Sequence, residues 1–285
     1  MRLINKRCIS VGIFVPETKP FKRLLLTGAA GGLGSVLRQT LKPFADTIRL
    51  SDIIAPADKP QAETGEELIL CNLADKASVE QLVAGCDAIV HMGGVSVERS
   101  FEEILEANIK GVFHIYEGAR RHGVKRVIFA SSNHAIGFYR QDQVIDAGVP
   151  RRPDGYYGLS KAYGEEMASF YFDRYGIETV SIRIGSCFPV AKDRRMMHTW
   201  ISARDLTELI RCALVTEKVG HTIVYGMSDN KQVWWANHLA ARLNFVAQDT
   251  SEIFREQVER QPMPAADDPV TVYQGGAFTA QGPFE

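Results

Sequence analysis

The sequence has no excess of charge of either sign. Its 33 lysine and arginine residues are balanced by 34 aspartate and glutamate residues, which gives a net charge of -1. A protein that binds nucleic acid or an anionic membrane through its surface usually carries a basic patch or a basic excess. The charge balance therefore argues against both kinds of partner.

Long hydrophobic runs are also absent. No uncharged apolar run approaches the roughly 18 residues that a membrane helix needs. The short apolar stretch Val11–Val15 is too brief for the core of a signal peptide. We therefore expect residues 1–20 to be a disordered N-terminal extension rather than a targeting segment.

Cysteine and histidine are not arranged as ligands or disulfide partners. The 5 cysteines are odd in number, are widely spaced and form no CxxC pair, and the 7 histidines form no HxxxH motif. These patterns argue against a disulfide framework and against a zinc site. They fit a protein of a reducing compartment, so we expect a cytoplasmic protein without a metal.

The sequence does contain a regular alternation of short apolar segments with helical patterns. The expected strands are Arg23–Thr27, Thr47–Leu50, Leu68–Cys71, Ala88–His91, Val127–Ala130, Ile177–Ile184 and Thr222–Tyr225. The expected helices include Ser78–Val83, Phe101–Arg121, one beginning near Gly158, Ala203–Leu214 and Gln232–Leu243, and the proline-containing last 25 residues are expected to be an extended tail. This alternation predicts an α/β protein with a Rossmann-type, doubly wound parallel sheet.

A glycine-rich turn follows the first expected strand. The segment Thr27–Gly34 reads TGAAGGLG and leads into a helical pattern. Gly28 allows a tight exit from the strand, Gly31 lets the backbone approach a pyrophosphate, and Gly34 lets the helix pack closely on the sheet. This context, between a strand and a helix, favours dinucleotide binding over an ordinary turn.

Asp52 ends the second expected strand. An acidic side chain there accepts hydrogen bonds from the adenosine ribose and repels a 2′-phosphate. The neighbouring Ser51, Ile53 and Ile54 offer no cation for such a phosphate. This favours NAD over NADP, although Asp52 would also suit the start of a loop. The cofactor-binding candidates from these two motifs are Gly28, Gly31, Gly32, Leu33, Gly34 and Asp52.

Tyr157 and Lys161 are four residues apart, so they share one face of the expected helix. A tyrosine has an ordinary pKa of about 10, and a neighbouring ammonium favours its phenolate. Ser132 ends the fifth expected strand and would orient a substrate hydroxyl beside this pair. Asn108 would either support the same hydrogen-bond network or have a purely structural role.

Together, the glycine turn, Asp52, Ser132 and the YxxxK pair resemble the extended short-chain dehydrogenase/reductase superfamily. Further motifs are similar to those of bacterial NAD-dependent uronate dehydrogenases. They are His91–Ser96 (HMGGVS), Ser131–Gly137 (SSNHAIG), Arg183–Cys187 (RIGSC), Arg195-Met196, Trp234-Trp235 and Gln274-Gly275-Gly276. Asn72 departs from the acid that often precedes the leucine after the third strand, which weakens an expected adenine contact.

The resemblance implies roles for individual residues. Tyr157 would be the catalytic base, Lys161 its partner and Ser132 the hydroxyl-orienting residue. The further cofactor contacts would be Asn72, Leu73, Gly93, Lys161 and Cys187, and the substrate contacts would be Ser96, Ser132, Asn133, His134, Tyr157, Ser186 and Arg195. An arginine is the natural clamp for a uronate carboxylate, and the adjacent Arg194 is an alternative to Arg195. We expect Trp234 and Trp235 to serve core or subunit packing rather than sugar stacking.

These expectations define a function and a division of the chain. Residues 21–185 would form an NAD-binding Rossmann domain with the catalytic helix. Residues 186–285 would form a small substrate-binding lobe and tail within the same compact unit. The implied activity is oxidation of C1 of D-glucuronate or D-galacturonate to the aldarolactone, in a homo-oligomer by resemblance. The alternatives are a sugar-nucleotide epimerase or reductase of the same superfamily and a non-enzymatic dinucleotide sensor.

Overall fold

The computed structural model describes residues 19–57, 61–282 and 284. The first 18 residues of the expected N-terminal extension, including Cys8, lie outside the described residues. Within the described ranges, no helix has both the length and the apolar character that a membrane crossing needs.

A parallel sheet of seven strands forms the centre of the molecule, in the order β3-β2-β1-β4-β5-β6-β7. The strands are β1 (Phe21–Thr27), β2 (Ala45–Asp52), β3 (Glu66–Leu70), β4 (Ala88–His91), β5 (Arg126–Ser132), β6 (Glu178–Ile184) and β7 (His221–Gly226). All seven expected strands are present, and the predicted fold class is confirmed. The order reverses between β1 and β4, and ligands bind beyond the carboxyl ends of strands at such a switch point.

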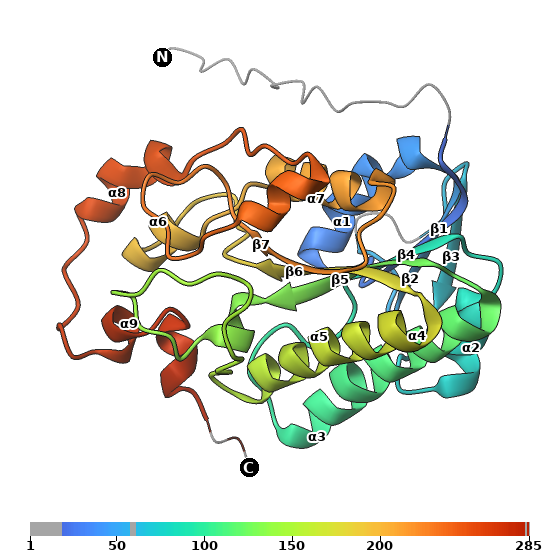
Figure 1. Ribbon diagram of the computed structural model, residues 1–285, viewed down its shortest axis with the longest axis horizontal. Helices are drawn as coiled ribbons and strands as arrows, with labels where there is room; N and C mark the ends of the chain where they lie inside the picture. The colour runs from blue at the N-terminus through green and yellow to red at the C-terminus, as the bar shows by residue number, and fades with distance from the viewer. Residues whose placement is uncertain (1–18, 58–60, 283, 285) are drawn as a thin grey trace.

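Helices cover both faces of the sheet (Figure 1). On one face lie α1 (Gly32–Thr40) and α7 (Ala203–Val215), and on the other lie α2 (Lys76–Val83), α4 (Gly111–His122) and α5 (Tyr156–Tyr175). Since α7 and β7 belong to residues 186–285, that region completes the sheet as well as adding helices beyond it.

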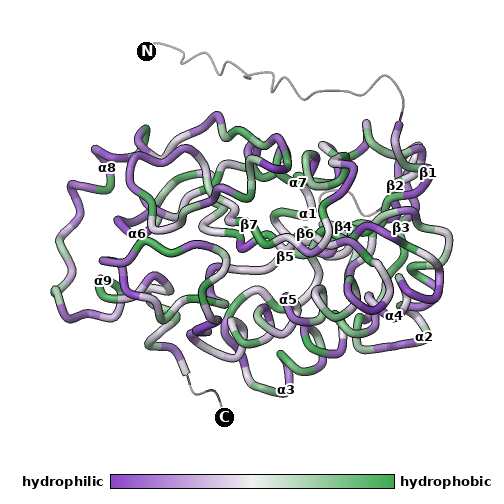
Figure 2. Tube along the Cα trace, viewed as in Figure 1, coloured by the Kyte–Doolittle hydropathy of each residue, from purple (hydrophilic) through white to green (hydrophobic). Residues whose placement is uncertain are grey.

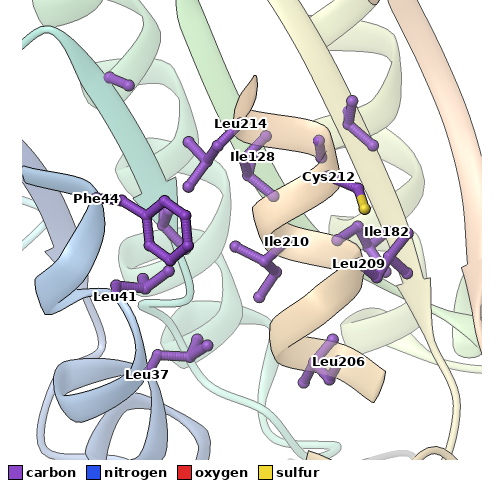
Figure 3. Packing of buried hydrophobic residues seen from close by; sticks show 14 of the residues in the cluster. Leu37, Leu41, Phe44, Ile128, Ile182, Leu206, Leu209, Ile210, Cys212 and Leu214 are labelled. Carbon is purple, nitrogen blue, oxygen red and sulfur yellow. The ribbon is translucent and has the colours of Figure 1, made fainter. Parts of the chain in front are cut away.

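Alternate side chains of β1, β4 and β5 enter different cores. Leu24 and Leu26 of β1 belong to the core beneath α1 and α7, whereas Leu25 belongs to the core beneath α2, α4 and α5. Figure 3 shows Ile210 of α7 facing Phe44 in the first of these cores. Hydrophobic residues accordingly follow the central strands and hydrophilic residues the outer segments in Figure 2. Burial of the inner strands on both faces explains their continuous apolar runs, whereas the edge strand β3 has no buried residue.

Two helix predictions need correction. The segment Phe101–Arg121 is helical but is divided into α3 (Phe101–Ile104), a π-helical stretch (Leu105–Lys110) and α4. The predicted helix Gln232–Leu243 is wrong over its first half, because Trp235 forms an isolated bridge with Ile145 and only His238–Leu243 is a 3-10 helix. Trp234 and Trp235 are both buried in one apolar cluster with Tyr225, which an extended backbone allows. Their expected packing role is confirmed.

The predicted extended C-terminal tail is also wrong. The last part of the chain contains α9 (Pro269–Val272) and a 3-10 turn at Gly276–Ala280, and α8 (Arg255–Glu259) precedes them. Pro269 occupies the first turn of α9, where its missing N–H costs nothing, and Asp268 caps that helix. With α6 (Arg194–Thr199), which the sequence pattern did not reveal, α8 and α9 lie beyond the carboxyl ends of the strands (Figure 1).

Candidate active site

The glycine turn leads directly from β1 into α1. Gly28 has a φ of 71°, and a Cβ on it would lie 2.7 Å from the carbonyl carbon of Met92, so only glycine fits there. Gly31 caps α1, which begins with Gly32, Leu33 and Gly34. The N–H groups of this helix end are oriented to receive an anion such as a pyrophosphate.

Asp52 is hydrogen-bonded to the glycine turn. Its carboxylate accepts the N–H of Ala30 at 2.9 Å and that of Ile53 at 2.7 Å. A cavity of about 140 Å³ opens beside it, lined by Thr27, Gly28, Ser51, Asp52, Ile53, Cys71, Asn72, Leu73, Gly93, Gly94, Val95 and Ala107. The lining combines a carboxylate with apolar walls and includes no lysine or arginine. This donor and acceptor set fits an adenosine with a free ribose diol.

Three predicted cofactor contacts differ in their surroundings. Asn72 is exposed, and its side-chain oxygen accepts the N–H of Ala74 at 3.0 Å. Leu73 is buried against Gly93, whose N–H donates to the hydroxyl of Thr27 at 3.0 Å. Cys187 is partly buried, and burial raises the pKa of its thiol to about 12, so the thiol is no nucleophile at neutral pH.

Tyr157 and Lys161 lie in the first two turns of α5 and are both buried. Nζ of Lys161 donates to the carbonyl of Ala130 at 2.8 Å and lies 5.4 Å from the ring centroid of Tyr157. Burial lowers the pKa of Lys161 to about 8. Burial also raises the pKa of Tyr157 to about 12, while the nearby hydroxyl of Ser132 lowers it. The protein alone therefore keeps the phenol protonated at neutral pH.

Ser132 connects the end of β5 to the tyrosine. Its hydroxyl caps the 3-10 helix Asn133–Ile136 by accepting the N–H of His134 at 3.2 Å. It also lies near enough to the phenol of Tyr157 to lower the pKa of that phenol. The structure thus brings the three predicted catalytic side chains, Ser132, Tyr157 and Lys161, to one place at the carboxyl end of the sheet.

Glu98 is a member of this region that sequence reasoning missed. Its buried carboxylate accepts the N–H groups of Tyr156 and Tyr157 at 2.7 and 2.9 Å. The first turn of α5 has no acidic residue of its own, and its N-cap Gly155 has no side chain to cap the helix. A carboxylate from the loop after β4 therefore caps the helix that carries Tyr157.

Asn108 joins the same loop to α5 from the π-helical stretch. Its amide donates to the carbonyl of Val95 at 3.0 Å and to the hydroxyl of Ser160 at 2.9 Å, and it accepts the N–H of Val95 at 2.8 Å. Both ends of the amide have partners within the protein. Of the two expected roles of Asn108, this supports the structural role. Ser96 lies on this loop with an exposed side chain.

Arg195 of α6 is held by contacts from three directions. Nε donates to the carbonyl of Gln274 at 2.6 Å and Nη1 to the hydroxyl of Ser186 at 3.3 Å. With its amide oriented to satisfy both ends, Asn133 accepts from Nη2 of Arg195 at 2.6 Å and donates to the carbonyl of Ile184 at 3.1 Å. Arg194, in contrast, donates to the carbonyls at positions 259 and 261. Of the two adjacent arginines, Arg195 is the one among the predicted site residues.

His134 lies between Asp154 and the C-terminal segment. Its Nδ1 is 2.7 Å from Oδ2 of Asp154, and its ring stacks on Phe278 at a centroid distance of 3.8 Å. The ring of Tyr157 approaches it edge-on at 5.7 Å. Asp154 and Phe278 were not among the predicted site residues. The Phe278 contact comes from the segment that the sequence pattern assigned to a tail.

His91, at the end of β4, has structural surroundings. His91 is buried, with Nδ1 at 2.7 Å from the hydroxyl of Thr27, and burial lowers its pKa to about 3. In the described part of the chain, no group of three or more histidine, cysteine, aspartate or glutamate side chains is arranged to hold a metal ion.

Comparison with known proteins identifies the family of this chain. The model of the NAD dependent epimerase/dehydratase family matches residues 24–216. A uronate dehydrogenase of Pseudomonas syringae pv. tomato is 68% identical over 265 residues, which are 93% of this chain and 96% of that protein. A uronate dehydrogenase of Pseudomonas putida is 66% identical over 94% of this chain and 99% of that protein.

Solved structures give the same result. The crystal structure of uronate dehydrogenase from Agrobacterium tumefaciens has a TM-score of 0.89 and 45% identity, and the match covers 93% of this chain and 98% of that one. A substituted form of that enzyme, complexed with NAD, matches with a TM-score of 0.89 and 44% identity over 93% of this chain and 99% of that one. The predicted family, enzyme class and NAD cofactor are thereby confirmed. The chain belongs to the NAD-dependent epimerase/dehydratase family and, within it, to the uronate dehydrogenases, which are NAD-dependent oxidoreductases.

Proposed function

We propose that this protein oxidises C1 of D-glucuronate and D-galacturonate to the aldarolactone while NAD+ is reduced to NADH. The observation that carries the proposal is the position of Arg195, which contacts residues that follow β5 and β6. Ser132 ends β5 and lies near Tyr157. One small sugar acid could then use both groups. Arg195 would bind its carboxylate, and Tyr157 would take its hydroxyl proton.

Arg195 is the proposed carboxylate clamp. A guanidinium has five N–H donors, and the contacts with Gln274, Ser186 and Asn133 use three of them. Two donors remain, the number that a bidentate carboxylate contact requires. Burial lowers the pKa of Arg195 while Asp193 and Asp154 raise it, and a guanidinium stays charged at any working pH.

Tyr157 is the proposed base. It would take the proton of the anomeric hydroxyl while C1 loses a hydride, and Ser132 would hold that hydroxyl by a hydrogen bond. Bound NAD would supply the hydride acceptor and a positive charge that favours the phenolate. Lys161, held by the carbonyl of Ala130, would add its own positive charge and favour the phenolate. Asp52 and the glycine turn would hold the adenosine and the pyrophosphate, with Asn72, Leu73, Gly93 and Cys187 along the cofactor.

Asn133 and Ser186 are proposed to act through Arg195 as well as on the sugar. Both ends of the Asn133 amide have partners within the protein, and the hydroxyl of Ser186 also hydrogen-bonds Thr199 at 2.9 Å. Their main contribution would be to aim the guanidinium, and the exposed Ser96 would approach the sugar from the loop after β4.

The direct test mixes the purified protein with NAD and follows NADH absorbance with glucuronate, galacturonate and glucose in turn. We expect turnover with both uronates, lactone as the first product, and turnover with glucose lower by orders of magnitude. Absence of NADH formation with both uronates, from protein shown to bind NAD, would contradict the proposal. Tightly retained NAD and conversion of a sugar nucleotide without net NADH would favour an epimerase instead.

We also propose that the enzyme works as a homo-oligomer in the cytoplasm. The cysteines at positions 71, 86, 187 and 212 are all unpaired in the described part of the chain, which suits a reducing compartment. Residues 21–185 would form the cofactor-binding part and residues 186–285 the substrate lobe of one compact unit. Sedimentation of the purified chain would determine its association state.

A further inference from the structure

We propose that Asp154 is a positioning residue that holds His134 with its proton on Nδ1, so that Nε2 accepts a hydrogen bond from a ring hydroxyl of the sugar. This inference rests on the proposed uronate oxidation, since it assigns a protein partner to one hydroxyl of that substrate. The hydroxyl in question is a ring hydroxyl other than the one at C1, which belongs to Tyr157 and Ser132.

The contact between the two side chains sets the position of the proton. Nδ1 of His134 lies 2.7 Å from Oδ2 of Asp154, and the Asp154 side chain has no exposed surface. An ionised carboxylate only accepts hydrogen bonds, so Nδ1 of His134 must donate. In a neutral imidazole Nε2 is then an acceptor, and burial lowers the pKa of His134 below its ordinary value.

The free nitrogen remains available to a ligand. In the described part of the chain, Nε2 of His134 has no hydrogen-bond partner. This nitrogen is also not fully buried. About a tenth of the side chain is exposed (10%). The paired nitrogen is therefore part of a buried contact, and the unpaired nitrogen keeps some exposed surface.

Two aromatic rings fix the plane of the imidazole. Phe278 stacks on it at 3.8 Å with an interplanar angle of 22°, and Tyr157 meets it at 5.7 Å with an angle of 60°. A sugar whose C1 hydroxyl lies on Tyr157 has its other ring hydroxyls a few bond lengths away. His134 is thus placed and oriented to contact one of them.

Three glycines make room for the Asp154 carboxylate. A Cβ on Gly137 would lie 1.9 Å from Oδ2, one on Gly158 would lie 2.9 Å from Oδ1, and one on Gly275 would lie 2.0 Å from Oδ2. These glycines come from the loop after β5, from α5 and from the C-terminal segment. The arrangement leaves the carboxylate one orientation and gives Gly275, in the Gln274-Gly275-Gly276 motif, a physical role.

The Asp154 carboxylate is explained neither by a gain in folding stability nor by a favourable effect on the pKa of Tyr157. Oδ1 of Asp154 is buried with no hydrogen-bond partner among the described residues, which costs folding free energy. The negative charge of Asp154 also raises the pKa of Tyr157, which opposes formation of the phenolate. A loss of activity on removing the charge would therefore act through His134 or through Arg195, whose pKa Asp154 raises, and the tautomer measurement separates the two routes.

The first experiment measures the tautomer without any substrate. The full chain is labelled with ¹⁵N-histidine, and the His134 signals are assigned by their loss in His134→Phe. We expect the wild-type spectrum to show a protonated Nδ1 and an unprotonated Nε2, and Asp154→Asn to move the proton toward Nε2. A proton on Nε2 in the wild type would overturn the proposal, and so would an unchanged tautomer in folded Asp154→Asn.

The second experiment compares glucuronate with its monodeoxy analogues. In the wild type, removal of the hydroxyl that His134 contacts should lower kcat/KM about tenfold to a hundredfold, since a buried acceptor loses its partner. In Asp154→Asn and His134→Phe, uronate KM should rise by a similar factor, and the same deoxy substitution should have little further effect. Strictly additive losses for every deoxy position in both variants would contradict the proposal.

Asp205→Asn is the matched control. Asp205 is also buried, and its carboxylate accepts from Ser228, Gln248 and Asp249, with no histidine involved. We expect this variant to lose stability but to keep the His134 tautomer and the deoxy effect. If the wild type is inactive toward uronates, only the proposed function is contradicted. The tautomer measurement still tests the role of Asp154. It also decides that role if Asp154→Asn does not fold.

Discussion

The backbone carbonyl of Gln274 lies 2.6 Å from Nε of Arg195 and accepts its hydrogen bond. The side chain of Gln274 is buried and fully paired, because its Oε1 accepts from Trp235 at 2.9 Å and its Nε2 donates to the carbonyls of Arg140 and Gln143. Gln274 therefore joins the apolar cluster around Trp235 to the guanidinium proposed to bind the substrate.

Replacement of Gln274 by alanine should loosen this connection. We expect uronate KM to rise about tenfold or more, because loss of buried hydrogen bonds of roughly 1 kcal/mol each frees the C-terminal segment. The dissociation constant for NAD should not change. Asn237→Ala is the control, since Asn237 pairs with the backbone of Tyr225 in the same cluster and does not contact Arg195. Equal KM changes in both variants would count against a specific role for Gln274.

Tyr157→Phe tests the base. Proton transfer by a positioned side chain contributes about a hundredfold to ten-thousandfold, so kcat should fall by that order while NAD binding persists. The neighbouring Tyr156→Phe alters a side chain that is 37% exposed and should retain nearly full activity. Steady-state kinetics and a fluorescence titration with NAD measure the two quantities, and substantial turnover by Tyr157→Phe would assign the base elsewhere.

The pH dependence should reflect Lys161. In the protein without cofactor, the pKa of Tyr157 is about 12 and that of Lys161 about 8. In the proposed mechanism the base is the deprotonated phenol, so kcat/KM should rise with pH, and the charges of bound NAD and Lys161 should bring this rise toward neutrality. Lys161→Met removes one charge and should move the rise to higher pH by about one unit or more. An unchanged pH profile would show that Lys161 does not act on the phenol.

Asp52 should decide between the two nicotinamide cofactors. Asp52→Asn keeps the shape of the side chain and removes the charge that would repel a 2′-phosphate. We expect the ratio of kcat/KM for NADP to that for NAD to rise about tenfold, because a like-charge contact costs on the order of 1 kcal/mol or more. Asp46→Asn, at the exposed beginning of the same strand, should leave the ratio unchanged.

The parts of the site that were predictable from sequence depend on local pattern. The glycine turn and Asp52 lie at the ends of adjacent strands, and the spacing of Tyr157 and Lys161 gives their shared helix face directly. Apolar strand segments identified the sheet because a parallel strand is buried on both faces.

The remaining parts depend on contacts between distant segments. Glu98 caps a helix that begins 58 residues later, and Gln274 reaches Arg195 across 79 residues. The prolines near the C-terminus suggested an extended tail, but Pro269 begins a helix and Gln274 is buried through long-range hydrogen bonds. No local pattern specifies such partners, because the path of the whole chain decides which side chains meet.

We propose that one side chain, Arg195, selects a sugar acid for oxidation by Tyr157. The most direct test compares the ratio of kcat/KM for glucuronate to that for glucose in the wild type and in Arg195→Met. We predict a strong preference for glucuronate in the wild type and loss of at least about a hundredfold of it in the variant, since a charge-assisted bidentate contact is removed. An Arg195→Met enzyme that prefers glucuronate as strongly as the wild type would contradict the account.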